Sequence, residues 1–277
     1  MATIRETLKA AAVRLQNAGV PIADHDAAML LAHVLKEDML MMKFNAHREL
    51  KAEDAAAYEA LLARREKREP LQYIIGETGF MGLVFSVTPS VLIPRPDTEI
   101  LCEEAIRRIG DAPLRVLDIG TGSGALAVSI AHHCKNAQVT AADISPDALE
   151  TAKKNARRNG ADVCFVLSDC FSAVAGETFD VIVSNPPYIS DAEMETLEPE
   201  VLLEPHLALR AAGDGLAFYE RISREAKEYL APGGCLLFEI GWQQKDAVSA
   251  LLRERIGEPF ALKDYGDNWR VVGAVKA

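Results

Sequence analysis

The stretch Leu114-Arg-Val-Leu-Asp-Ile-Gly-Thr-Gly-Ser-Gly124 decides the fold of this 277-residue chain. Its first half, up to Ile119, is an apolar run of strand length. The glycines that follow lead into residues 124–133, where apolar residues have helical spacing. A buried strand that turns through glycines directly into a helix is the opening of a βαβ unit. The stretch therefore predicts an α/β fold with a ligand site at the turn.

Strands and helices alternate along the rest of the chain from this point. Strands are expected at 114–119, 138–142, 163–167, 179–183 and 234–240, and helices at 124–133, 146–159, 216–230 and 243–255, with two further β-prone runs at the end. This alternation predicts a parallel, doubly wound (Rossmann-like) sheet with helices on both faces. Such sheets bind ligands beyond the carboxyl ends of the strands, at the point where the strand order reverses.

The residues that precede the sheet have a different pattern. Apolar residues recur at helical spacing from Thr3 to about Arg68, with a break at 17–21 where Gly19 is a plausible C-cap and Asp24 a plausible N-cap. A third helix is expected at 52–67. Two short β-prone runs follow, at 72–75 and 83–87, and predict a hairpin. We therefore expect a helical domain at 1–70 with a docking or recognition role, a linking hairpin at 71–90 and the domain that contains the sheet at 91–277.

Composition excludes several classes of protein. The 30 Lys and Arg against 41 Asp and Glu give a net charge of −11, which disfavours a protein that mainly grips phosphate backbones. There is no apolar run of the roughly 20 residues that span a bilayer and no export signal, so we expect a cytoplasmic protein without membrane contact. Five scattered cysteines without a C-x-x-C pair argue against a metal site or disulfide framework.

The glycines of Asp118-Ile-Gly-Thr-Gly-Ser-Gly124 predict a ligand-binding turn. Glycine lets the backbone turn sharply and approach a ligand closely, and the following helix offers free N–H groups. The spacing also fits the looser dinucleotide fingerprint, with Ala125 in the last position. No Lys follows the glycines, which excludes a P-loop, and a plain tight turn is the remaining structural alternative.

Two acidic positions after the next strands are typical of a nucleoside site. Asp143 ends the strand at 138–142, where a carboxylate can bind the ribose hydroxyls of either NAD or S-adenosylmethionine. Asp169 and Phe171 follow the next strand, where the carboxylate can meet an adenine amino group and the ring can stack on the base. A helix cap and a core aromatic are equally good interpretations of this second pair.

The loop Ser184-Asn-Pro-Pro-Tyr188, directly after a predicted strand, discriminates between these cofactors. Two prolines fix two φ angles and remove two N–H donors, leaving a stiff loop with available carbonyls. Asn185 Oδ1 and the Pro186 carbonyl can accept both protons of a planar NH2 group, while Tyr188 packs against its plane. Such a nitrogen is a poor nucleophile, so orientation toward a methyl sulfonium replaces a strong base. The loop predicts methyl transfer to an amide or amino nitrogen.

Together these motifs resemble the class I S-adenosylmethionine-dependent methyltransferases that modify amide or exocyclic amino nitrogens. The chain is also similar, essentially over its whole length, to the peptide chain release factor glutamine methyltransferases of the HemK/PrmC family. That resemblance rests on Ile93-Pro-Arg-Pro-Asp-Thr-Glu99, Asn185-Pro-Pro-Tyr-Ile189, Glu204-Pro-His-Leu-Ala-Leu209 and Asp264-Tyr-Gly-Asp-Asn268. A sister family that acts on a ribosomal protein shares the Asn-Pro-Pro-Tyr loop, but the run from Arg95 to Glu99 favours the release factor branch. Cys170 departs from the pattern, since an apolar residue is more usual there.

The resemblance implies N5-methylation of the glutamine in the Gly-Gly-Gln loop of release factors, with S-adenosylmethionine as methyl donor and S-adenosylhomocysteine as product. It assigns ribose binding to Asp143 and adenine binding to Asp169 with Phe171. The methionine end is assigned to the turn formed by Gly120, Thr121, Gly122, Ser123 and Gly124. Catalysis is assigned to Asn185, Pro186 and Tyr188, substrate binding to Asn185, Pro186, Pro187 and Tyr188, and a cofactor contact to Asn185.

Three further residues of these motifs have open roles. Arg95 and Glu99 either order the cofactor or substrate loop or form structural ion pairs, and for Glu204 only its position argues for a role. A nucleotide-binding module or NAD enzyme on the same fold is a further alternative, but it leaves the Asn-Pro-Pro-Tyr loop unexplained.

An adenine N6 methyltransferase could use the same loop on a flipped base. Charge favours a protein substrate, because the 25 residues from 185 to 209 contain no Lys or Arg and six acids, which are Asp191, Glu193, Glu195, Glu198, Glu200 and Glu204. Such a rim would repel a phosphate backbone, although helix capping or solubility would also account for it. We expect release factors as partners, no sustained nucleic-acid binding, and a monomer.

Overall fold

The computed structural model describes residues 2–277, and the chain divides into two compact units. One unit, here called the helical unit, comprises the residues up to Gly76 together with Glu198–Leu203. The other, here called the sheet unit, comprises Glu77–Leu197 and Glu204–Ala277. The helical unit therefore ends later than position 70 and includes a short segment from far along the chain, which the sequence did not predict.

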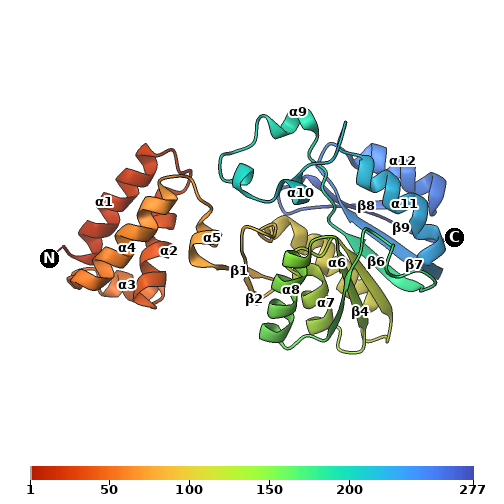
Figure 1. The fold of residues 1–277 in the computed structure, drawn as a ribbon, viewed down its shortest axis with the longest axis horizontal. Helices are drawn as coiled ribbons and strands as arrows, with labels where there is room; N and C mark the ends of the chain where they lie inside the picture. The colour runs from red at the N-terminus through yellow and green to blue at the C-terminus, as the bar shows by residue number, and fades with distance from the viewer. Residues whose placement is uncertain (1) are drawn as a thin grey trace. The chain divides into compact units, whose positions relative to one another are not determined.

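The helical unit contains five helices, α1 (Ile4–Asn17), α2 (Ala23–Leu35), α3 (Met39–Phe44), α4 (Ala52–Arg65) and α5 (Leu71–Ile75) (Figure 1). A capping box between Thr3 and Glu6 begins α1. Ile22 is the N-cap residue of α2, so the expectation that Asp24 caps it is wrong: Asp24 lies in the first turn. The short helix α3 was not predicted. Its N-cap is Asp38, whose carboxylate accepts from Met41 N at 2.7 Å.

The segment expected as a strand at 72–75 is the helix α5 instead. Pro70 stands at its N-cap and Gly76, with φ of 86°, at its left-handed C-cap. These two residues define a single helical turn, and Leu71 and Ile74 bury their side chains in the core of the helical unit. The β-branched residues of this run have a high strand propensity, but the caps and the burial determine its structure.

The sheet of the second unit has seven strands in the order β5-β4-β3-β6-β7-β9-β8. The strands are β3 (Arg115–Ile119), β4 (Gln138–Asp143), β5 (Val163–Leu167), β6 (Phe179–Ser184), β7 (Leu230–Glu239), β8 (Pro259–Lys263) and β9 (Trp269–Val275). The doubly wound α/β class is confirmed, but β9 pairs antiparallel with both β7 and β8, so the sheet is not parallel throughout. The strand order reverses between β3 and β6, which places the expected ligand crevice at their carboxyl ends.

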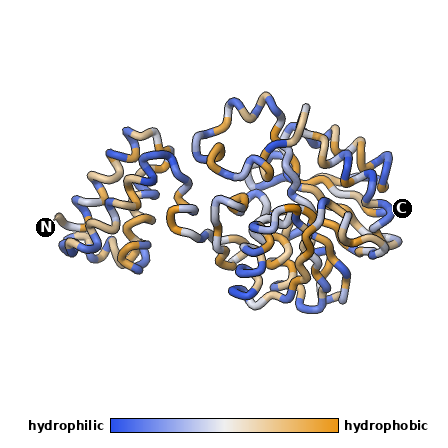
Figure 2. Tube along the Cα trace, in the orientation of Figure 1, coloured by the Kyte–Doolittle hydropathy of each residue, from blue (hydrophilic) through white to orange (hydrophobic). Residues whose placement is uncertain are grey.

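Helices cover both faces of this sheet and form two separate cores. The core on one face includes α6 (Glu99–Ile109), α7 (Ala125–His133) and α8 (Pro146–Asn159), and the core on the other includes α11 (Ala217–Tyr229) and α12 (Lys245–Arg255). Figure 2 shows hydrophobic strands between helices that are hydrophilic on their outer sides. The helix α6 was not predicted, and the remaining short turns are η1 (Pro96–Thr98), α9 (Asp191–Met194), η2 (Val201–Leu203) and α10 (His206–Leu209). Among residues 2–277 there is no helix with the length and apolar character that a membrane span needs.

A hairpin does form in the linking segment, but its first strand is β1 (Glu77–Phe80) and not the run at 72–75. Its second strand is β2 (Leu83–Ser86), as expected, and the hairpin belongs to the sheet unit. The side chains of Phe80 and Phe85 are buried in the same core as α8. Asn155 of α8, which is fully buried, exchanges hydrogen bonds of 2.7 and 3.0 Å with the backbone of Ser86 and donates to Ser123 O at 2.8 Å. This one amide therefore connects the hairpin to the glycine turn.

Replacement of this amide should destabilise the sheet unit. In Asn155→Ala the backbone groups of Ser86 and Ser123 lose their buried partners, and we expect the free energy of unfolding to fall by about 1–3 kcal/mol in urea denaturation. The control is Asn159→Ala one turn later, whose side chain is partly exposed and bonds Val84 O; there we expect a loss below about 1 kcal/mol. Equal losses in the two variants would contradict the linking role of Asn155.

Candidate active site

A cavity of about 340 Å³ lies at the carboxyl ends of β3, β4 and β6. It brings together most of the predicted site residues, although they come from four separate loops. Those that line it are Gly120, Thr121, Gly122, Ser123, Asp143, Asp169, Asn185, Pro186 and Pro187. Among the residues that the structure describes, three predicted ones are not part of its lining: Gly124, Phe171 and Tyr188.

The glycine turn after β3 has the backbone conformation that its sequence predicts. Gly120, Gly122 and Gly124 have φ values of 75°, 55° and 82°, in the left-handed region that favours glycine. A Cβ on Gly120 or Gly122 would meet no described protein atom within 4 Å, so the space beside both is open. A Cβ on Gly124 would lie 3.0 Å from the Cβ of Ala152 in α8. The first two glycines therefore leave room for a ligand, and the third allows close helix packing.

Hydrogen bonds to the end of β4 hold this turn in place. Gly120 N and Thr121 N both donate to Ala142 O, at 2.8 and 3.0 Å. The Asp143 carboxylate accepts from Gly122 N through Oδ2 at 2.8 Å and from Ser145 N through Oδ1 at 2.9 Å. Burial raises the pKa of Asp143, although these backbone hydrogen bonds lower it in part. A carboxylate oxygen can accept more than one hydrogen bond, so Asp143 can still bind a pair of hydroxyls.

Asp118 at the end of β3 has a structural role beneath the turn. Its Oδ2 accepts from Thr121 Oγ1 at 2.6 Å and from Ala127 N at 3.3 Å, which connects β3 to α7. The residue is fully buried, and Oδ1 has no hydrogen-bond partner among residues 2–277. Burial raises the pKa of Asp118 to about 7.

The expected adenine contacts are only partly brought to the cavity. Asp169 lines it and forms a 2.7 Å ion pair with Arg221 of α11. The expectation that Phe171 stacks on a base does not fit its position: its side chain is 1% exposed and stacks on Tyr229 at 4.4 Å inside the core. The aromatic residue that lines the cavity near Asp169 is Phe218, together with Ile222. Their i, i+4 spacing predicts that they share a helix face, but not that this face lies at the cavity.

The Asn-Pro-Pro-Tyr loop begins where β6 meets β3. The Ser184 hydroxyl donates to Ile119 O at 2.7 Å, which fixes the start of the loop to the end of β3. Asn185 Nδ2 donates to Thr98 Oγ1 at 3.3 Å, and Asn185, Pro186 and Pro187 line the cavity. The loop therefore lies on the same cavity as the glycine turn.

Tyr188 occupies a different environment from the rest of its loop. Its ring packs against the core that contains α11 and α12, and burial raises its pKa well above the usual range. Its backbone carbonyl accepts from Gln244 Nε2 at 3.0 Å. A Cβ on Gly215 would approach the same carbonyl to 2.4 Å, so only glycine fits there. Tyr188 therefore anchors the loop, and the expectation that its ring packs against the substrate does not fit this position.

The motif residues with open roles separate into two groups. The buried Glu204 accepts from Ile93 N at 3.0 Å and forms an ion pair with Arg95, which lines the cavity. Glu99 instead accepts from Met81 N at 2.7 Å, in the turn of the hairpin. Of the two roles left open for Glu99, its contact with the hairpin supports the structural one. Arg95 forms an ion pair and also lines the cavity.

The Asp264-to-Asn268 motif forms the turn between β8 and β9. Asp264 accepts from Gly266 N and Asn268 N at 2.9 and 3.0 Å, and these bonds lower its pKa. Its other oxygen pairs with Arg270 at 3.0 Å, and Arg270 also reaches Asp97 at 3.1 Å. The motif thus positions η1, the turn that contains Thr98.

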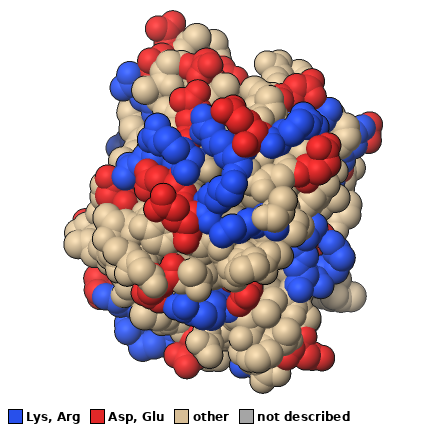
Figure 3. All heavy atoms as spheres, turned by 90° about the vertical axis from the view of Figure 1, so that its right-hand side faces the viewer, with Lys and Arg blue, Asp and Glu red and all other residues tan. Residues whose placement is uncertain are grey.

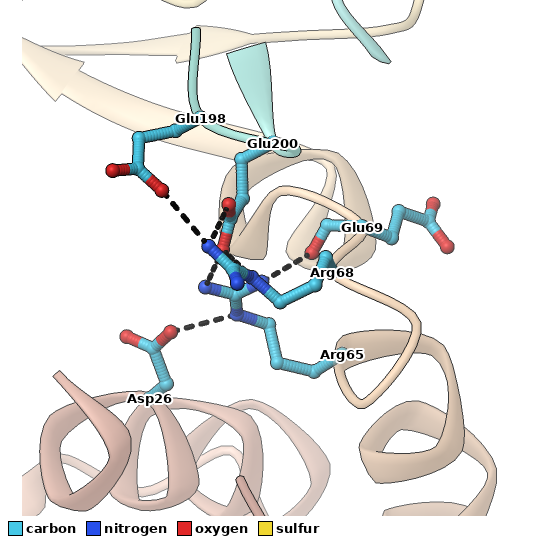
Figure 4. A network of polar contacts seen from close by, with 6 residues as sticks. All are labelled: Asp26, Arg65, Arg68, Glu69, Glu198 and Glu200. Carbon is cyan, nitrogen blue, oxygen red and sulfur yellow. Dashed lines mark hydrogen bonds and ion pairs between the residues drawn. The ribbon is translucent and has the colours of Figure 1, made fainter. Parts of the chain in front are cut away.

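The acidic segment after the loop is largely neutralised. In the helical unit, Glu200 accepts from Arg65 at 2.8 Å and from Arg68 at 2.6 Å, and Arg65 also pairs with Asp26 at 2.7 Å (Figure 4). Burial raises the pKa of Glu200, but its hydrogen bonds to Arg68 and Arg65 outweigh that effect and lower it.

In the sheet unit, Asp191 pairs with Arg210 at 2.6 Å, and Glu193 caps its own helix with Ser190. On the face shown in Figure 3, basic side chains lie among acidic ones. Four of the six acids from 185 to 209 are therefore in ion pairs, so the segment repels a phosphate less than its sequence suggests.

Comparisons with known proteins match both units. The family model for the PrmC N-terminal domain matches residues 6–76, and the model for the methyltransferase small domain matches residues 98–217. The chain is 45% identical over 273 residues to the release factor glutamine methyltransferase of Geobacter sulfurreducens, covering 98% of this chain and 96% of that one. It is 40% identical over 248 residues to the enzyme of the same name from Escherichia coli, covering 89% and 90%.

Solved structures support the fold. A T. thermophilus 16S rRNA methyltransferase, in complex with AdoMet and guanosine, matches with a TM-score of 0.53 at 22% identity over 73% of this chain and 50% of that one. A methyltransferase from Pyrococcus furiosus matches with a TM-score of 0.52 at 24% identity, over 71% and 90%. At these identities the likeness shows a shared methyltransferase fold.

The buried carboxyl of Asp118 should make stability depend on pH. Its folded pKa of about 7 lies above the ordinary value of 3.8, so the wild type loses stability as pH rises from about 4 to 7 and levels off above. Asp118→Asn keeps an acceptor for Thr121 but cannot ionise. We expect its unfolding free energy, relative to the wild type, to rise by at most about 4 kcal/mol across that window. A constant difference between pH 4.5 and pH 7.5 in urea denaturation would contradict a neutral Asp118.

Proposed function

The chain belongs to the release factor glutamine methyltransferase family, and from this premise we propose that it methylates N5 of the glutamine in the Gly-Gly-Gln motif of peptide chain release factors, with S-adenosylmethionine as cofactor. The observation that carries the proposal is that the Asn-Pro-Pro loop and the open glycine turn border one cavity. The proposed donor site and the proposed amide-binding loop thus share one cavity. With this substrate, we propose the cytoplasm as the site of the reaction.

The residues around the cavity fit the cofactor. When bound, S-adenosylmethionine supplies an electrophilic methyl group. The open space beside Gly120 and Gly122 would take its methionine end, and the Asp143 carboxylate its ribose hydroxyls. Asp169 and the apolar side chains of Phe218 and Ile222 would surround the adenine. This set differs from the sequence-based one in its aromatic member, since Phe171 lies in the core.

The loop residues account for how a weak nucleophile is activated. A carboxamide nitrogen shares its lone pair with the carbonyl, so it attacks only in a fixed orientation. Asn185 Oδ1 and the Pro186 carbonyl would accept its two protons and hold the nitrogen in place. Both prolines are rigid and line the cavity, and Ser184 and Tyr188 fix the two ends of the loop. The two acceptors would therefore already be in position when the substrate binds.

We propose that the helical unit recognises the release factor, as the sequence predicts. It matches the PrmC N-terminal family model, and the catalytic motifs all belong to the sheet unit. Its helix α3 exposes Leu40 and Phe44 at 63% and 76%. Large exposed apolar side chains are frequent at protein-binding surfaces.

Incubation with S-adenosylmethionine and a purified release factor, followed by peptide mass spectrometry, tests the function. We expect a mass increase of one methyl group on the glutamine of the Gly-Gly-Gln motif. A ribosomal protein and an adenine-containing DNA duplex are incubated in parallel, because both alternatives use the same loop chemistry. Methylation of either one without methylation of the release factor would overturn the proposal.

Asn185→Ala removes one of the two acceptors proposed for the substrate amide. We expect kcat on the release factor to fall by about 10²–10³, the usual effect of losing one aligned polar group at a reacting centre. The dissociation constant for S-adenosylhomocysteine, measured by calorimetry, should stay within about threefold. Turnover close to that of the wild type would exclude the role of Asn185.

Asp143→Ala should have the opposite effect, because its carboxylate is the proposed ribose acceptor. We expect S-adenosylhomocysteine to bind at least about tenfold more weakly in calorimetry, equivalent to about 1.4 kcal/mol. Asp162→Ala is the matched control, since this exposed residue precedes the neighbouring strand β5, and its affinity should not change. An unchanged affinity in Asp143→Ala would contradict the ribose assignment.

A further inference from the structure

Glu239, the last residue of β7, is a buried acid that no motif identified. Its strand pairs in parallel with β6, and Phe238 lies opposite Ser184 in the register. Glu239 therefore lies one position beyond that pair, beside Asn185. The residue is 1% exposed, and its Oε2 has no hydrogen-bond partner among residues 2–277. Leaving a buried carboxyl oxygen without a partner costs free energy, so stability alone does not explain an acid here.

Glu239 accepts side-chain hydrogen bonds from Thr98 and Asn185. Burial raises its pKa to about 7, and side-chain hydrogen bonds from Thr98 and Asn185 counteract that effect. Asn185 Nδ2 also donates to Thr98 Oγ1 at 3.3 Å. The amide nitrogen of Asn185 thus points toward an acceptor cluster formed by η1 and β7. Because a carboxamide is planar, its oxygen Oδ1 points to the other side.

We propose that Glu239 is a positioning residue that, together with Thr98, fixes the carboxamide of Asn185 so that Oδ1 faces the substrate. An ionised carboxylate can only accept hydrogen bonds, so it favours the orientation with the Asn185 nitrogen inward. In the flipped orientation Oδ1 would face the carboxylate, and two acceptors would meet in a buried space. The inference rests on the proposed function, because only an amide or amine substrate needs Oδ1 as an acceptor.

Other charged groups around Glu239 set how it titrates. Arg270 on β9 favours the ionised form, whereas Asp97 in η1 disfavours it. Arg270 is shared with Asp97 and Asp264, so its charge is partly balanced. Tyr188 and Tyr219 also face the group, but burial keeps the pKa of both phenols well above neutral pH. Glu239 is therefore the group in this cluster whose charge changes near pH 7.

Glu239→Gln tests the proposal, because glutamine keeps the shape but can donate as well as accept. The Asn185 carboxamide can then hydrogen-bond to residue 239 in either orientation, so Oδ1 no longer faces the substrate all of the time. We expect kcat on the release factor to fall by about 10- to 100-fold. KM and the dissociation constant for S-adenosylhomocysteine should stay within about twofold. In the wild type kcat should rise with pH through about 7 as Glu239 ionises, and this rise should be absent in the variant. Glu228→Gln, an exposed acid on α11, is the control and should behave as the wild type.

A second readout does not depend on activity. The side-chain NH2 signals of Asn185, identified as the pair missing from the Asn185→Ala spectrum, should shift with pH near 7 in the cofactor-free wild type but not in Glu239→Gln. If Glu239→Gln does not fold, Thr98→Val removes the other acceptor and should lower kcat with KM unchanged. Wild-type kcat in Glu239→Gln, or Asn185 signals that do not respond to pH in the wild type, would overturn the proposal. A wild-type enzyme that does not methylate the release factor would contradict the proposed function instead, and the NMR result would still decide whether Glu239 orients Asn185.

Discussion

The site depends on carboxylates that end adjacent strands and accept hydrogen bonds from the loops that follow. Asp118, the penultimate residue of β3, accepts hydrogen bonds from Thr121 and the start of α7. Asp143, the last residue of β4, accepts from Gly122 N and Ser145 N. Gly120 N and Thr121 N still reach a strand carbonyl, Ala142 O. The N–H groups further along the loops have no strand partner, so their acceptors come from side chains. An acid at the end of a strand meets this need and still leaves lone pairs directed at a ligand. The glycine turn, with three positive φ angles, is held in its open conformation in this way.

The acids after the Asn-Pro-Pro-Tyr loop mostly form ion pairs with arginines, so they add little to the electrostatic potential at the surface. The net charge of −11 and the acids after the Asn-Pro-Pro-Tyr loop suggested a surface that repels phosphates. Instead Glu200 belongs to the helical unit, held by Arg65 and Arg68, and Glu204 holds Ile93 and Arg95 in the sheet unit. Each of these acids is thus ion-paired within its own unit. The preference for a protein substrate therefore rests on the family, because paired acids repel little.

Patterns of adjacent residues predicted the central strands and the loops of the site, whereas the features that depend on tertiary packing were not predicted. The strands from β3 to β7, the glycine turn and the Pro-Pro loop follow from runs of adjacent residues, so the sequence predicted them. The run at 72–75 has the β-branched residues of a strand, but the flanking Pro70 and Gly76 cap it as a helical turn. Whether Phe171 or Phe218 reaches the cavity depends on how α11 packs, and no local pattern contains that information. Glu239 was missed for the same reason: an acid after an apolar run has no significance until β7 is known to lie beside β6.

The two buried acids of the site, Asp118 and Glu239, lower the stability of the folded protein. Burial raises the pKa of Asp118 and of Glu239 to about 7, and each has an oxygen without a partner. A group whose folded pKa is raised above its unfolded value makes the folded state less stable as pH rises toward neutral. Neutral side chains of the same shape would avoid this cost, since replacing buried charges is often stabilising. Asp118 lies beneath the glycine turn and Glu239 lies beside Asn185, and both of these loops border the cavity. The positions of the two acids therefore follow the requirements of the site and not those of the core.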